Sequence, residues 1–308
     1  MPRCGSQCYL CDLPISFDTY RGCTHGCVYC FANDKRTGSK GVFEDVQIGE
    51  TAVALLRHIQ SNRINDTRWA DWDIPLHWGG MSDPFQQYLE LLAQCNVVLQ
   101  ISLVCPSYDA FEPGCPTYSQ RLDIIRKTAP KVQRLIVRMQ PYIPLYVAEC
   151  LQALADFKEA GAYGVVAEGI KYSSKKPHTV QLGADFVYPM PLLKLHFERL
   201  REKAHSLGLA FYVGENRLRT LGDSLTCCGV EGVAGFKPNT FNLNHILNGD
   251  SEVQPTSAML LENTGYPFKA LYQDTSNGNY WSGLSFKDAM LLYYKHNKHN
   301  VLRIFGKR

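Results

Sequence analysis

The chain has 308 residues, of which 45% are hydrophobic and 20% are charged, and its formal net charge is +3. This composition is close to the globular average and excludes a collagen-like, coiled-coil or wholly disordered protein. The small net charge neither requires nor excludes a nucleic acid partner. No apolar run approaches the ~20 residues of a membrane span, and the first residues lack the apolar core of a signal peptide. We therefore expect a cytoplasmic protein with no membrane partner.

Strand-like and helix-like segments alternate along most of the chain. β-rich runs cover residues 15–20, 74–78, 97–104, 135–139, 163–167 and 209–213. Helical patterns cover residues 45–61, 84–92, 119–128, 146–160, 192–206 and 286–295. Six β-runs separated by helices predict an α/β fold, in which a parallel sheet with helices outside closes partly into a barrel.

The composition changes after about residue 215, where Asn, Gly, Pro, Ser and Thr become frequent. Such residues are typical of loop-rich structure. The sequence thus predicts three parts: a cysteine-rich segment over 1–14, a barrel core over 15–215 and a loop-rich C-terminal extension over 216–308.

Twelve cysteines are unevenly distributed along the chain. In a cytoplasmic protein they are poor candidates for a disulfide framework, because the thiol pools there keep such bonds reduced. Metal binding or thiol chemistry is therefore the expectation. Half of the cysteines lie in the first thirty residues, as two trios with the spacing C-x3-C-x2-C: Cys4, Cys8 and Cys11, then Cys23, Cys27 and Cys30.

The second trio, Cys23, Cys27 and Cys30, places three thiols within eight residues. Gly22 and Gly26 give the backbone the freedom to wrap around a cluster. A structural zinc site needs four closed ligands, and no nearby Cys or His after Cys30 completes such a set. The trio therefore favours a 4Fe-4S cluster with one open iron, and an open coordination position is typical of catalytic sites.

The segment around this trio, YRGCTHGCVYCFA over Tyr20 to Ala32, resembles the cluster loop of the radical S-adenosylmethionine (SAM) superfamily. More narrowly, it resembles the spore photoproduct lyase-like branch. This resemblance implies a partial (β/α)6 barrel in which Cys23, Cys27 and Cys30 each bind one iron, while SAM chelates the fourth and Tyr29 lies near its adenine. It also implies reductive cleavage of SAM to a 5′-deoxyadenosyl radical, with an electron donor such as flavodoxin or ferredoxin, and hydrogen abstraction from a substrate.

Residues that would hold SAM follow the second predicted strand, since barrels of this type carry reactive groups at strand ends. Gly79 and Gly80 permit close backbone approach to a ligand. Together with Asp83 they resemble the GGE stretch with which the superfamily holds the amino group of SAM. Met81 stands where the family's acid usually lies, so Asp83 or backbone carbonyls would serve instead.

Three further candidates lie on later predicted strands. Ser102 is a candidate for the ribose of SAM, and Arg138 for its carboxylate, because a guanidinium donates two parallel hydrogen bonds to a carboxylate. Pairing of Arg138 with a structural acid is the alternative. Glu168 ends a strand and is a candidate for a SAM hydroxyl or the substrate, with Glu215 following the sixth strand.

The N-terminal trio, Cys4, Cys8 and Cys11, lacks the glycine and aromatic neighbours of the cluster loop. Three interpretations stay open. The trio forms an auxiliary zinc or iron–sulfur site that Cys227 or Cys228 completes, its thiols are uncoordinated in a flexible terminus, or the adjacent Cys227 and Cys228 act as a redox or radical relay.

A thiol is also able to donate a hydrogen atom to a product radical, and Cys105, at a strand end, is the best candidate for that catalytic role. The leading functional hypothesis is a radical SAM lyase or modification enzyme acting on a nucleic acid or nucleotide, by analogy with spore photoproduct lyase. The alternatives are a radical SAM enzyme for a peptide or small metabolite, and a non-catalytic metal-binding regulator. A full complement of barrel helices and strands argues against the regulator.

Overall fold

The computed structural model describes residues 26–30, 93, 97–182, 185–224, 227, 229 and 231–233, and the backbone of five short strands nearer the N-terminus. Those strands are β1 (Arg3–Cys4), β2 (Ile15–Ser16), β3 (Tyr20–Arg21), β4 (Gln47–Ile48) and β5 (Thr67–Trp69). The strand predicted over 74–78 and the helices predicted over 84–92 and 286–295 lie outside the described residues.

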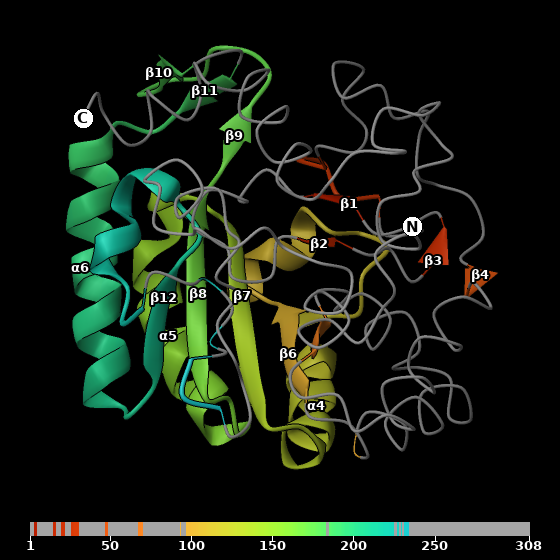
Figure 1. The fold of residues 1–308 in the computed structure, drawn as a ribbon. Helices are drawn as coiled ribbons and strands as arrows, with labels where there is room; N and C mark the ends of the chain where they lie inside the picture. Colours follow the sequence, from red (N-terminus) through yellow and green to blue (C-terminus); the bar gives the residue numbers. More distant parts are fainter. Residues whose placement is uncertain are drawn as a thin grey trace, which may run out of the picture.

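A five-stranded parallel sheet forms the centre of the described structure (Figure 1). Its members are β5, β6 (Val97–Ser102), β7 (Arg134–Tyr142), β8 (Gly164–Gly169) and β12 (Ala210–Val213), and every neighbouring pair is parallel. They follow one another across the sheet in chain order, without the reversal of a doubly wound sheet. This is the order that a (β/α) barrel requires. Within the described residues β5 and β12 are the sheet's two edges, so closure into a barrel stays a prediction.

Three helices connect successive strands: α4 (Tyr118–Thr128), α5 (Val147–Glu159) and α6 (Met190–Ser206). A capping box starts α4, in which the Thr117 hydroxyl accepts from the Gln120 amide and the Gln120 side chain accepts from the Thr117 amide. Apolar residues of all three helices pack in one core with alternate residues of the sheet. These strand residues are Leu99, Ile101, Leu135, Val137, Val165, Ala167, Phe211 and Val213.

The intervening strand residues belong to the other face of the sheet, as the two-residue period of a strand requires. There Val98, Ile136, Val166 and Tyr212 pack together with Cys227 and Val233. The sheet is thus covered by helices on one face and by a segment from beyond residue 226 on the other.

Most predicted elements within the described residues are confirmed. The strands predicted over 97–104, 135–139, 163–167 and 209–213 and the helices predicted over 119–128, 146–160 and 192–206 all form, with small shifts of their ends. The β-rich run over 15–20 is divided between β2 and β3. The helix predicted over 45–61 is wrong at Gln47–Ile48, which pairs with Tyr20–Arg21 as an antiparallel strand. Pairing between distant segments here overrides a local helical pattern.

A second sheet was not predicted. Strands β9 (Lys171–Tyr172), β10 (Val180–Leu182) and β11 (Asp185–Val187) form an antiparallel sheet in the order β10–β11–β9, between β8 and α6 in the chain. Figure 1 shows it beyond the end of β8. Strands of two or three residues are too short to produce a recognisable alternation of apolar and polar residues.

A buried pair links the sheet to α6 and predicts a pH dependence of stability. The Tyr142 hydroxyl lies 2.8 Å from Nδ1 of His196. Burial, together with the charge of Arg199, lowers the pKa of His196 from its ordinary value of 6.5. The unfolded chain therefore binds more protons than the folded chain as the pH falls through that ordinary value, which favours unfolding.

We accordingly expect the thermal unfolding midpoint to fall between pH 7.5 and pH 5.5, and His196→Gln to show a smaller fall. Glutamine keeps a polar group for the Tyr142 hydroxyl but does not titrate in this range. Thermal unfolding of both proteins at the two pH values measures the difference. An identical fall in wild type and variant would assign the pH dependence to other groups.

Candidate functional site

Residues 26–30, here called the cysteine turn, lie at the carboxyl end of β6. The Val28 amide donates a hydrogen bond to the carbonyl oxygen of Phe111 (3.0 Å). Phe111 directly follows the 3-10 helix η3 (Pro106–Ala110), which begins four residues after β6. Gly26 has a φ of +63°, a conformation that glycine adopts without strain. Two of the three predicted cluster ligands, Cys27 and Cys30, are therefore held at the edge of the sheet where (β/α) folds carry their reactive groups.

Tyr29 anchors the cysteine turn to the core. Its ring meets the ring of Tyr108 edge to face, with the centroids 6.2 Å apart, and its hydroxyl donates a hydrogen bond to Glu112. Tyr108 is fully buried, contacts the rings of Phe111 and Tyr146, and donates a hydrogen bond to a backbone carbonyl. The side chain of Tyr29 thus fixes the turn in place, while its predicted position near an adenine stays a prediction.

Glu112, which accepts the hydrogen bond from Tyr29, is itself part of a buried ion pair with Arg121. Arg121, near the start of α4, places Nη1 2.5 Å from Oε2 of Glu112 and Nη2 3.2 Å from Oδ1 of Asp109. It also donates to the carbonyl oxygen of Ser102 at the end of β6 (3.4 Å). Both Arg121 and Glu112 are buried. The sequence analysis missed this pair, because a loop glutamate and a helix arginine nine residues apart carry no signal that distinguishes them from solvated charges.

A third thiol, that of Cys115, lies beside the two thiols of the cysteine turn. The Sγ atoms of Cys27 and Cys115 are 3.9 Å apart, and both residues are partly buried. The interaction with Cys27, followed by burial, raises the pKa of the Cys115 thiol. In the sequence Cys115 is an isolated cysteine with no assigned role, because 88 residues separate it from its neighbour.

The candidates Ser102, Arg138 and Glu168, on three neighbouring strands, lie on one face of the sheet. Ser102 is the register partner of Arg138, and Arg138 pairs with Val166, two residues before Glu168. By the alternation described above, all three belong to the face opposite α4, α5 and α6. Arg138 also donates a hydrogen bond to Gln140 on the same strand. The structure therefore brings Ser102 and Arg138 side by side, with Glu168 on the next strand.

Two buried carboxylates at the ends of β8 and β12 each pair with a cation. Oε1 of Glu168 lies 2.8 Å from Nζ of Lys171, and Oε1 of Glu215 lies 2.8 Å from Nε of Arg217. Glu168 and Glu215 are each only 5% exposed. Between them in the fold, Gly214 leaves no room for a side chain, because a Cβ there would lie 2.8 Å from Oε2 of Glu168. Sequence reasoning selected both acids but neither cation.

The charges in this group shift each other's pKa. The negative charge of Glu168 raises the pKa of Lys171. Burial alone would raise the pKa of Glu215, but the hydrogen bonds and charge of Arg217, with the charge of Lys171, outweigh burial and lower it. The Arg217 and Lys171 cations therefore stabilise the ionised form of Glu215. The Lys171 side chain is half exposed, while its ammonium group is paired with the buried Glu168 carboxylate at the carboxyl end of β8.

Cys105 is fully buried in the core that also contains Cys150. A hydrogen bond with Cys105 and burial raise the pKa of the Cys150 thiol. The two residues thus form a second thiol pair, separate from Cys27 and Cys115. The predicted role of Cys105 as a hydrogen-atom donor stays a prediction.

Several predicted site residues lie outside the described residues: Cys8, Cys11, Cys23, Gly79, Gly80, Asp83 and Cys228. For Cys4 only the backbone is described, as part of β1. Cys227 is buried on the second face of the sheet, where its carbonyl oxygen accepts a hydrogen bond from Gln100 (3.0 Å). Within the described part of the chain, no three His, Cys, Asp or Glu side chains are grouped as ligands of one metal ion. The full cluster trio and the auxiliary site therefore stay predictions.

No family model matches this chain, and no curated protein sequence does. Among the described helices, none combines the length and the apolar composition needed to cross a membrane.

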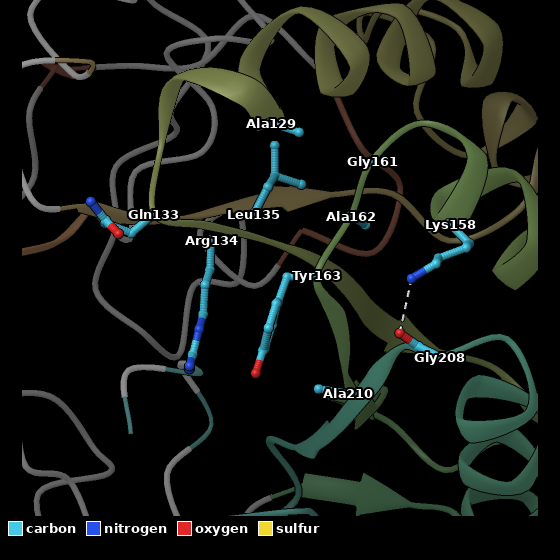
Figure 2. Close-up of a pocket in the computed structure, with 10 residues that line it drawn as sticks. All are labelled: Ala129, Gln133, Arg134, Leu135, Lys158, Gly161, Ala162, Tyr163, Gly208 and Ala210. Atoms are coloured by element: carbon cyan, nitrogen blue, oxygen red, sulfur yellow. Dashed lines mark hydrogen bonds between the residues drawn. The ribbon is translucent and has the colours of Figure 1, made fainter. Parts of the chain in front are cut away.

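A pocket of about 500 Å³ lies at the opposite, amino end of the sheet (Figure 2). In this pocket the Arg134 guanidinium stacks on the Tyr163 ring, 4.2 Å from its centroid, and donates to the carbonyl oxygens of Gly229 and Glu231 (both 2.7 Å). Lys158 donates to the carbonyl oxygen of Gly208 (3.0 Å). The two cations of the pocket, Arg134 and Lys158, are thus hydrogen-bonded to the protein's own backbone. Residues at the amino end of the strands in (β/α) folds generally contribute to stability. The candidate site is at the carboxyl end.

Proposed function

We propose that this chain is a radical SAM enzyme whose 4Fe-4S cluster is held by Cys23, Cys27 and Cys30. One observation carries the proposal: the turn with Cys27 and Cys30 is docked at the carboxyl end of a parallel sheet whose strands follow one another in chain order. A structural metal knuckle has no need of that position, whereas catalytic groups of (β/α) folds gather there.

The described residues fit a thiolate-ligated cluster. Cys27 and Cys30 are partly rather than fully buried, and they flank Tyr29, whose side chain is turned into the aromatic contacts with Tyr108. Thiolate sulfur is the ligand that iron–sulfur clusters require. The two thiols are therefore partly exposed, while Tyr29 holds the turn against the core.

Three residues on neighbouring strands would bind and orient SAM. The Arg138 guanidinium is suited to its carboxylate, Ser102 to a ribose hydroxyl, and Glu168 to a further hydroxyl or the substrate. When bound, the cluster and SAM supply one-electron cleavage of the sulfonium and a 5′-deoxyadenosyl radical that abstracts hydrogen. The chain's own contribution is to hold these groups at one edge of the sheet, with Glu112 and Arg121 fixing the turn. Cys105 is 0% exposed, so its proposed role as hydrogen-atom donor would require the core to open a path to its sulfur.

For the substrate we infer a nucleic acid or nucleotide. Lys171, whose side chain is half exposed, and the neighbouring Tyr172, whose ring meets that of Tyr188 with centroids 6.2 Å apart, support this inference. A cation beside aromatic rings suits a phosphate beside a base. A peptide or small metabolite is the alternative substrate class, and flavodoxin or ferredoxin is the proposed electron donor.

The activity is tested with the anaerobically reconstituted 308-residue chain. We expect about four irons per chain, or more with an auxiliary site, and formation of 5′-deoxyadenosine from SAM on reduction with dithionite. Iron quantification and chromatography of the products measure both. Protein that holds the iron but does not cleave SAM would overturn the proposal.

The substrate class is tested by deuterium transfer. Extracts from cells grown in deuterated medium are separated into nucleic acid, protein and metabolite fractions, and each is incubated with the reduced enzyme and unlabelled SAM. We expect deuterium in 5′-deoxyadenosine with the nucleic acid or nucleotide fraction. Transfer from the protein fraction alone would show the inferred substrate to be wrong.

A further inference from the structure

The cysteine turn and the loop over residues 111–115 lie against each other at three successive points. The Val28 amide bonds to the Phe111 carbonyl oxygen. A Cβ built on Gly26 would lie 3.9 Å from Cγ of Pro113. Cys27 lies between Gly26 and Val28 on the turn, and its Sγ atom is 3.9 Å from that of Cys115 on the loop. The two backbones thus run side by side, and their thiols meet.

At this distance the two thiols are in contact, and a small movement would allow them to form a disulfide. A disulfide requires the sulfur atoms to approach to about 2.05 Å. Both cysteines lie outside helices and strands, so side-chain rotation and small loop adjustments are not opposed by a backbone ladder. Both are also partly exposed, which gives a small oxidant access to the sulfur atoms.

We propose that Cys27 and Cys115 are a site of reversible disulfide formation in the cluster-free protein, with a small-molecule disulfide such as glutathione disulfide as the oxidant. The Cys27 sulfur attacks one sulfur of the oxidant, forming a mixed disulfide and releasing one glutathione. The Cys115 sulfur then attacks the Cys27 sulfur and releases the second glutathione. The protein gives up two electrons and two protons, and the oxidant becomes two thiols.

One consequence rests on the proposed function. A Cys27 sulfur bonded to Cys115 is not available to iron, so the disulfide and the cluster exclude each other. Oxidation of the cluster-free protein therefore closes the cluster site, and a dithiol reductant opens it again.

The chain supplies an internal control. Cys105 and Cys150 form the second thiol pair, but both are 0% exposed, within the core between sheet and helices. An oxidant has no access to these sulfur atoms in the folded protein. If solvent accessibility determines which thiols are oxidised, Cys27 will be linked to Cys115, and Cys105 and Cys150 will remain thiols.

The experiment uses the 308-residue chain freed of metal with a chelator, incubated with glutathione disulfide, alkylated, and digested without reduction. We expect mass spectrometry to find the Cys27–Cys115 cross-linked peptide, its loss in Cys115→Ser, and its disappearance with dithiothreitol. Circular dichroism checks that Cys115→Ser is folded. Recovery of Cys115 as the alkylated thiol while other cysteines are oxidised would overturn the proposal.

A second measurement separates this proposal from the proposed function. After oxidation, and without added reductant, iron incorporation is expected to fall in wild type and to persist in Cys115→Ser. Equal iron incorporation in the two proteins would refute the exclusion of the cluster by the disulfide. If the cross-link forms but the protein does not cleave SAM, the disulfide proposal is supported and only the proposed enzymatic function is overturned.

Discussion

Cys27→Ala is expected to abolish SAM cleavage, whereas Cys115→Ala is expected to leave it intact. The two variants form a matched pair, because each removes one partly buried sulfur, and the two sulfurs lie 3.9 Å apart. Loss of one of three thiolate ligands prevents stable binding of the cluster. Loss of Cys115 removes a neighbour that belongs to a different loop and lies outside the C-x3-C-x2-C spacing.

Two measurements decide this prediction: iron per chain after anaerobic reconstitution, and 5′-deoxyadenosine formed from SAM under reducing conditions. Both are expected to be lost in Cys27→Ala. If Cys115→Ala loses them as well, Cys115 is a ligand. The centre would then have four thiolates, and the open position on which the proposed chemistry depends would be gone.

Arg121→Met is expected to lower the free energy of unfolding by about 3–5 kcal/mol, because it removes the cationic partner of a buried carboxylate. Only 2% of the Arg121 side chain and 6% of the Glu112 side chain is exposed, so water does not compensate the lost pair. Methionine retains much of the side-chain volume, which limits the contribution of a cavity. The uncompensated Glu112 would also disturb its hydrogen bond with Tyr29 and with it the cysteine turn.

Arg126→Met on the same helix is the control. Arg126 is 44% exposed and pairs with Asp123, three residues earlier, so its loss is expected to cost less than about 1 kcal/mol. Chemical denaturation of both variants and wild type measures the difference. Equal effects of the two substitutions would show that the Arg121 ion pair does not contribute more than a surface pair.

Local patterns were sufficient for the elements that build the core. The helical stripe over 146–160 and the apolar runs over 97–104 and 209–213 form as predicted, because each buries its apolar residues against the same core. Ser102 and Arg138 were likewise predicted to lie on neighbouring strands, and they are register partners in the parallel sheet, while their predicted roles toward SAM stay predictions.

Features that depend on contacts between distant segments were not predictable. Nothing around Cys115 in the sequence indicates that a loop following η3 will bring its thiol to Cys27. The burial of Arg121 depends on the packing of α4 beside the end of β6, and polar residues carry no local sign of such burial. The helix prediction was wrong at Gln47–Ile48 for the same reason, because the strand that pairs with these residues is nearly thirty residues away in the sequence.

The docking of the cysteine turn also has a consequence for the order in which the protein matures. The surface that receives the turn is made of Tyr108, Phe111 and Glu112, and Glu112 is held by Arg121 of α4. That surface exists only after β6 and α4 have packed together, although the turn precedes both in the chain. Iron is thus expected to be retained only by chains whose sheet has already folded, so metal loading would report on correct folding rather than drive it.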